Sequence, residues 1–80
     1  MPDEITDRTT ERIGHLIGEY AHLCGRSLAE VAYALVKSKT LRRHGYSHAQ
    51  RGHLTETQGQ AAIRVLEFWI RSKNEQHQQG

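Results

Sequence analysis

The sequence predicts an all-α fold: a small three-helix bundle, with a short fourth helix allowed for, and a long basic loop before the last helix. Apolar residues recur at three- and four-residue steps in three separate stretches, which is the spacing of a buried helix face. Two of these stretches begin with a hydroxyl residue followed three positions later by Glu or Gln, the sequence form of a capping box. The loop holds basic residues and glycines, and Leu41 is its only strongly apolar aliphatic residue.

Eighty residues are enough for one domain with one core. We expect a flexible N-terminal segment over residues 1–8, a single helical domain over residues 9–73 and a disordered polar tail over residues 74–80. The first segment is charged and weakly patterned, and the tail contains only polar residues and glycine. With 36% hydrophobic and 25% charged residues, the composition is that of a soluble globular protein, and we expect a cytoplasmic location.

The first helix is predicted over about residues 9–24. Its apolar face contains Ile13, Leu16, Ile17, Tyr20, Leu23 and Cys24. Gly25 follows at the position of a left-handed C-terminal cap. Gly14 and Gly18 each cost about 1 kcal/mol relative to Ala, and they form a stripe of small residues with Ala21 and Gly25. We expect another helix to pack closely there, from the same chain or from a second copy; the alternative is simply a weak helix.

The second helix is predicted over about residues 27–38. Ser27 and Glu30 have the spacing of a capping box, the clearest start signal in the chain. The buried face is expected to contain Leu28, Val31, Ala32 and Leu35. Tyr33 and Lys37 point elsewhere, toward the edge of the basic loop. One further helical turn is expected around residues 40–44.

The third principal helix is predicted over about residues 55–73, and Thr55 and Gln58 form its capping box. Its apolar face is unusually wide, and it includes Ala62, Ile63, Val65, Leu66, Phe68, Trp69 and Ile70. A helix this apolar is either the central helix of the bundle or half of a dimer interface. We therefore predict a homodimer or partner interface at Ile63, Phe68 and Trp69.

The basic loop is the main functional signal. No acidic residue occurs between Glu30 and Glu56, although the whole chain has a net charge of only +2. Lys and Arg side chains replace counterions along phosphates, and aromatic or His rings stack on bases or hydrogen-bond to them. We therefore predict a nucleic-acid-binding or regulatory protein, with DNA favoured over RNA. The predicted binding residues are Lys37, Lys39, Arg42, Arg43, His44, Tyr46, His48, Arg51 and His53.

The stretch from Ser27 to Tyr46 resembles a bacterial helix-turn-helix. It has the order Ser-x-x-Glu-Val-Ala-x-x-Leu followed by Ser-Lys-Thr-Leu-Arg-Arg. The resemblance implies a supporting helix from Ser27 to Leu35 and a recognition helix from Ser38 that enters the major groove. The sequence departs from that pattern in two places: the turn is about a residue short and lacks glycine, and Gly45 would end the recognition helix early. No family is assigned on this basis.

The competing prediction is a protein-interaction module, such as an adaptor, an inhibitor or an immunity-type protein. The last helix has more apolar surface than so small a core needs, which is typical of an interaction surface. In that case the basic loop would meet an acidic protein surface.

Several other classes are excluded by what the sequence lacks. No apolar run approaches the length of a membrane-spanning helix, and the charged N-terminus is unlike a signal peptide. Cys24 is the only cysteine, so an internal disulfide and a Cys-based zinc site are excluded. His15, Glu19 and His22 share a helix face but match no known ligand signature, and we predict no metal and no cofactor. Because catalytic motifs are absent, we predict that the protein is not an enzyme.

Overall fold

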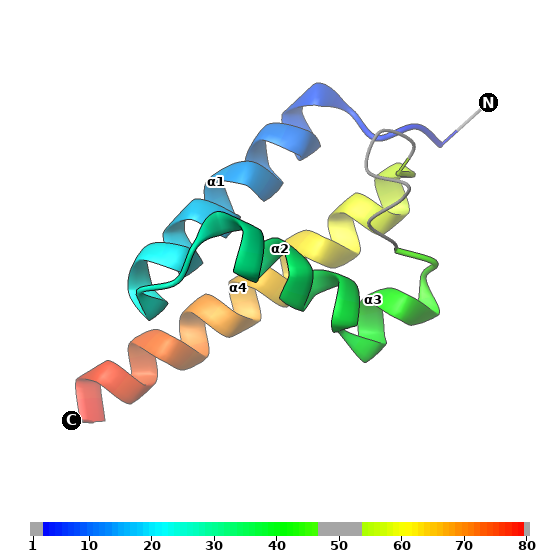
Figure 1. Cartoon of the computed structure of the whole chain (residues 1–80). Helices are drawn as coiled ribbons and strands as arrows, with labels where there is room; N and C mark the ends of the chain where they lie inside the picture. Colours follow the sequence, from blue (N-terminus) through cyan, green and yellow to red (C-terminus); the bar gives the residue numbers. More distant parts are fainter. Residues whose placement is uncertain (1–2, 47–53, 80) are drawn as a thin grey trace.

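The computed structural model describes residues 3–46 and 54–79, and within these residues the only regular elements are helices (Figure 1). The chain order is α1 (Asp7–Cys24), α2 (Leu28–Lys37), α3 (Lys39–Arg43) and α4 (Glu56–Gln79). α1 and α4 run side by side in the same direction, α2 turns back and packs against α1, and α3 packs against both α2 and α4. The predicted all-α fold is confirmed, and the helical turn expected around residues 40–44 is α3.

The predicted caps of α1 and α2 are present. Ser27 and Glu30 exchange hydrogen bonds: the Ser27 N–H donates to Glu30 Oε1 at 3.0 Å, and the Glu30 N–H donates to Ser27 Oγ at 3.1 Å. The bond from the Ser27 backbone lowers the pKa of Glu30. At the end of α1, Gly25 adopts a φ of 65°, and the following N–H, of Arg26, donates to Ala21 O at 2.9 Å.

The segment expected to be flexible is instead paired with the start of α4 from Asp3 onward. The Ile5 N–H donates to Leu54 O at 3.1 Å, and the Glu56 N–H donates to Asp3 O at 2.9 Å. α1 accordingly begins at Asp7 rather than near Thr9. This contact cannot be predicted from sequence periodicity, because the two backbone segments that it joins lie about fifty residues apart in the chain.

Two carboxylates form hydrogen bonds between the starts of α1 and α4, one from each segment. Glu56 accepts hydrogen bonds from the Thr6 N–H at 3.0 Å and the Thr9 hydroxyl at 2.6 Å. Asp3 accepts from the N–H and the hydroxyl of Thr57 at 3.3 and 2.7 Å. Because the positive ends of two parallel helices lie together here, an acceptor from each segment stabilises the other. We call these hydrogen bonds the N-terminal network.

The core is built from all four helices. Its fully buried large side chains are Leu35, Leu41, Leu66 and Val31. Leu41 belongs to the segment predicted as a loop, and its burial holds α3 against the bundle. No side-chain nitrogen or oxygen buried within the described residues lacks a hydrogen-bond partner. Burial in this core therefore leaves no polar side-chain atom of the described residues unpaired.

The end of α4 corrects the predicted tail. The helix does not stop near Lys73 but continues to Gln79, so most of residues 74–80 is helical. Glu and Gln are good helix formers, and no Pro or Gly interrupts the helix between Gly59 and Gly80. None of the helices in residues 3–46 and 54–79 is both long and apolar enough to cross a membrane.

Gly59 is predicted to be the glycine at which a side chain is least tolerated. A Cβ there would lie 2.8 Å from both Ile5 Cδ1 and Thr9 Cγ2, whereas a Cβ at Gly18 would meet nothing within 4 Å. Gly18→Ala should stabilise the fold by about 1 kcal/mol through helix propensity. Gly59→Ala should destabilise it by about 1–3 kcal/mol through crowding. Urea unfolding followed by circular dichroism measures both, and equal stabilisation by the two substitutions would contradict the close approach of α1 and α4.

Glu56 should make the fold sensitive to acid. Hydrogen bonds, first from the Thr9 hydroxyl and then from the Gln60 amide, lower the pKa of Glu56 from 4.5 to about 2. A lowered pKa means that the carboxylate stabilises the folded state above pH 4.5, and that this contribution is lost as the pH falls toward 2. The thermal unfolding midpoint of a Glu56→Gln variant should therefore lie below that of the parent at neutral pH, and the difference between the two midpoints should shrink as the pH falls. A difference that stays constant with pH would contradict this role.

Candidate functional site

Three exposed cationic side chains, Lys39, Arg43 and Arg64, lie on the helices α3 and α4 where these two pack together. A shallow depression of 330 Å³ lies between the two helices, and it is lined by Ser38, Thr40, His44, Ala61, Arg64, Val65, Phe68 and Trp69. Lys39 and Arg43 stand beside it on the exposed side of α3. We call this region the α3–α4 surface, and it comprises Lys39, Thr40, Arg43, His44, Arg64 and Phe68.

Three contacts fix α3 in place. The Leu41 side chain is fully buried. The Leu41 N–H donates a hydrogen bond of 3.5 Å to the hydroxyl of Ser38, which is the N-cap of α3. At the other end, the Gln58 side-chain amide donates to His44 O at 2.7 Å. Gly45 then turns the chain with a φ of 79°, a backbone conformation that glycine adopts readily. The cations of α3 are thus carried by an anchored element rather than by an open loop.

The helical turn divides these side chains among three directions. Thr40 and His44 are four residues apart and line the depression facing α4. Lys39 and Arg43, also four apart, project outward beside them. Arg42 lies two residues from both Thr40 and His44, which places it on the opposite side of α3. The predicted contact Arg42 therefore lies outside the α3–α4 surface.

The cations of this surface have no carboxylate partners within the described part of the chain. The two ion pairs found there join Arg12 to Glu67 at 3.5 Å and Arg26 to Glu30 at 3.7 Å. Both pairs involve other faces of the molecule. The positive charge of Lys39, Arg43 and Arg64 is consequently not neutralised by any ion pair among the described residues.

The three interface residues predicted on α4 differ in their exposure. Ile63 is buried, and Trp69 is partly buried against Tyr20, with ring centroids 5.4 Å apart. Phe68 alone is exposed, at 63%. The chain's own core therefore takes up most of the wide apolar face, and Phe68 remains as an aromatic side chain beside the cations.

Two predicted nucleic-acid contacts lie elsewhere. Tyr46 is buried in the core, so the prediction that its ring stacks on a base is wrong. Lys37 places its ammonium 4.6 Å from the centre of the Tyr33 ring, on the α2 face turned toward α1. Of the other predicted contacts, His48, Arg51 and His53 lie outside the described residues.

The sequence did not point to Arg64 or Gln58 as parts of this site. Arg64 belongs to the polar strip of α4, and only the packing of α3 on α4 brings it beside His44. Gln58 was identified as a capping residue, and its Oε1 does accept from the Thr55 N–H at 2.9 Å. Its amide group also ties down α3, which no local pattern indicates.

The helix-turn-helix resemblance does not extend to the structure. α3 has five residues, and Ser38 is both the last cap of α2 and the first cap of α3. A recognition helix this short cannot present several turns of side chains to a major groove. Among residues 3–46 and 54–79, no three His, Cys, Asp or Glu side chains come together as metal ligands would.

No family model, curated protein or solved structure matches this chain.

Leu41 is the residue whose replacement best tests the anchoring of α3. Because its side chain is fully buried, Leu41→Ala should cost about 2–5 kcal/mol of unfolding free energy. Thr40→Ala, at the exposed neighbouring position, should change it by no more than about 0.5 kcal/mol. Chemical denaturation compares the two, and a near-neutral Leu41→Ala would mean that α3 is not part of the core.

Proposed function

We propose that this protein binds single-stranded nucleic acid through the α3–α4 surface. Lys39, Arg43 and Arg64 would contact phosphates, and Phe68 would stack on a base. The observation that carries the proposal is an exposed aromatic side chain beside cations that have no carboxylate partner among the described residues. Proteins that bind single strands combine these two components, a basic track and a stacking ring.

Helix stability does not account for all of the charge. Arg42 and Arg43 lie in the last turn of α3, where a cation interacts favourably with the helix dipole. Lys39 occupies the first position of the same helix, where the dipole disfavours a cation. An external anion offers a reason for Lys39 that the fold does not, and this supports a binding role.

The shape of the surface favours a single strand over a duplex. α3 spans only about 7.5 Å, so its side chains reach two or three phosphates rather than the base edges of a groove. Phe68 needs an unpaired base to stack on, because bases in a duplex are already stacked on each other. The proposal covers DNA and RNA strands alike, with a DNA strand as the first probe.

An acidic protein segment with an apolar side chain is the second candidate for the same surface. Phe68 and the depression beside it fit such a partner as well, and this follows the predicted protein-interaction module. The salt dependence and the base requirement in the following experiment separate the two candidates.

The expected salt dependence follows from counting cations. Three phosphate contacts on a single strand give a slope of log affinity against log salt of about −2. Replacing Arg43 and Arg64 together by Ala should flatten that slope by about 1.4. Replacing Arg8 and Lys73 together removes the same charge from positions distant from α3, and it should leave the slope unchanged. Fluorescence anisotropy with a labelled oligodeoxythymidine measures each variant.

Phe68→Ala should behave differently from the charge variants. Losing one stacked base weakens binding by about 1–3 kcal/mol and leaves the salt slope as it was. The proposal fails if the Arg43/Arg64 variant binds as the parent does at every salt concentration. It also fails if abasic and normal strands bind equally well to the parent. Binding to an acidic peptide, without binding to any nucleic-acid strand, would favour the second candidate, an acidic protein segment, as the ligand of this surface.

A further inference from the structure

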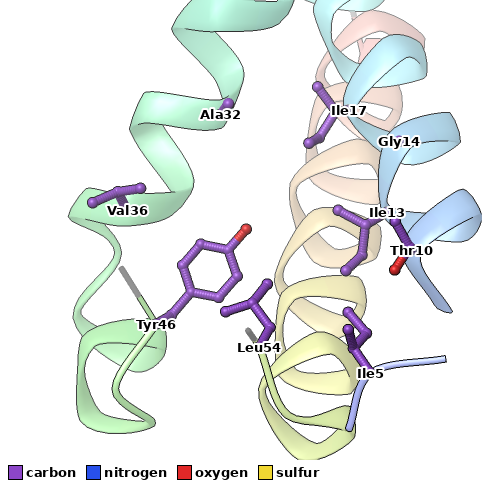
Figure 2. Close-up of a pocket in the computed structure, with 9 residues that line it drawn as sticks. All are labelled: Ile5, Thr10, Ile13, Gly14, Ile17, Ala32, Val36, Tyr46 and Leu54. Carbon is purple, nitrogen blue, oxygen red and sulfur yellow. The ribbon is translucent and has the colours of Figure 1, made fainter. Parts of the chain in front are cut away.

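An apolar groove runs between α1 and α2 (Figure 2). Two hollows of 570 and 190 Å³ adjoin there, because both are lined by Gly14 and Ile17 of α1 and by Ala32 and Val36 of α2. One end lies beside Leu28, and the ring of Tyr46 lies at the other end. We call this the α1–α2 groove.

The groove is open because small residues line it. A Cβ added at Gly14 or at Gly18 would meet nothing within 4 Å. Beside Gly14 and Gly18, the predicted close helix partner is therefore not found among the described residues, whereas Ala21 of the same stripe is buried in the core. Gly14 also lowers the stability of α1, because glycine is a poor helix former.

The edge of the groove exposes large apolar side chains. Leu28 is 61% exposed and Tyr33 is 59% exposed, and both line the wider hollow. One patch thus carries both a hollow and the protruding groups that such a hollow accommodates. A two-fold symmetric interface brings the same patch of both copies together, so it can set the protruding groups of one copy against the hollow region of the other. We propose that a second copy of this chain docks in the α1–α2 groove and forms a homodimer.

The charges around the groove fit one arrangement of the two copies. Glu11 lies one turn before Gly14 on the exposed side of α1, and Lys37 lies one residue after Val36 on α2. Thr10 and Val36 line the same hollow, so the acid and the base flank the same end of the groove. A two-fold axis along the groove sets α1 of each copy on α2 of the other. Glu11 of one copy then faces Lys37 of the other, twice per dimer.

This interface is separate from the α3–α4 surface. A two-fold axis along the groove leaves both copies of α3 at the same end of the dimer. Resting on the proposed function, this arrangement would offer one strand two basic surfaces. The dimer itself depends on the groove alone and is tested without nucleic acid.

Sedimentation equilibrium at tens of micromolar should give twice the 9.2 kDa chain mass. Gly14→Gln fills the groove while improving helix propensity, so it should raise the thermal midpoint of the monomer and abolish the dimer. Ala34→Gln, at an exposed position on the other face of α2, is the matched control and should remain dimeric. Glu11→Lys and Lys37→Glu should each weaken dimerisation by roughly 2- to 30-fold, and combining them should restore it.

A monomeric parent at these concentrations would overturn the proposal. So would a dimer that Gly14→Gln leaves intact, because the interface would then lie elsewhere. If the double variant dimerised as weakly as either single charge-reversal variant, the proposed symmetry would be overturned. None of these outcomes bears on strand binding by the α3–α4 surface, which is measured with the Arg43 and Phe68 variants.

Discussion

The fold depends on two helices that start at the same place and run in the same direction. Parallel helices bring their positive N-terminal ends together, which is unfavourable unless acceptors neutralise both. Glu56 of α4 caps the start of α1, and Asp3 before α1 caps the start of α4. Gly59 lets the two backbones approach closely. Gln58, in the same turn of α4, then holds His44 and so places α3. The N-terminal network thus holds the starts of α1 and α4 together, and the neighbouring Gln58 places α3 against them.

Local signals in the sequence predicted the elements that depend on local interactions. The Ser27–Glu30 and Thr55–Gln58 boxes and the Gly25 cap are satisfied within a few residues, so the sequence indicates them directly. The N-terminal network could not be predicted in this way, because its partners are about fifty residues apart and their residue types are common at any helix start. The continuation of α4 to Gln79 was not predicted, because a polar composition is typical of a disordered tail as well as of an exposed helix end.

The candidate site was only partly predictable for a related reason. The absence of acids between Glu30 and Glu56 identified the cations, but the face on which each one lies depends on packing. The segment expected to be an open loop contributes Leu41 and Tyr46 to the core, and this orders α3. The Lys37 ammonium lies over the Tyr33 ring, away from the α3–α4 surface, whereas Arg64 of α4 lines the depression of that surface. Phe68 therefore lies beside the cations of the α3–α4 surface, whereas Leu28 and Tyr33 lie at the α1–α2 groove, so the two proposed binding sites are separate.

The most direct test of the central claim is a nuclear magnetic resonance titration with a short oligodeoxythymidine, following the backbone amide signals. The account predicts that the largest shift changes fall on residues 39–44 and 64–68, at the junction of α3 and α4. Signals around Gly14 and Ala32, which line the groove, should move little. Changes centred on the groove, or no changes at concentrations where the strand is in excess, would contradict the assignment of binding to the α3–α4 surface.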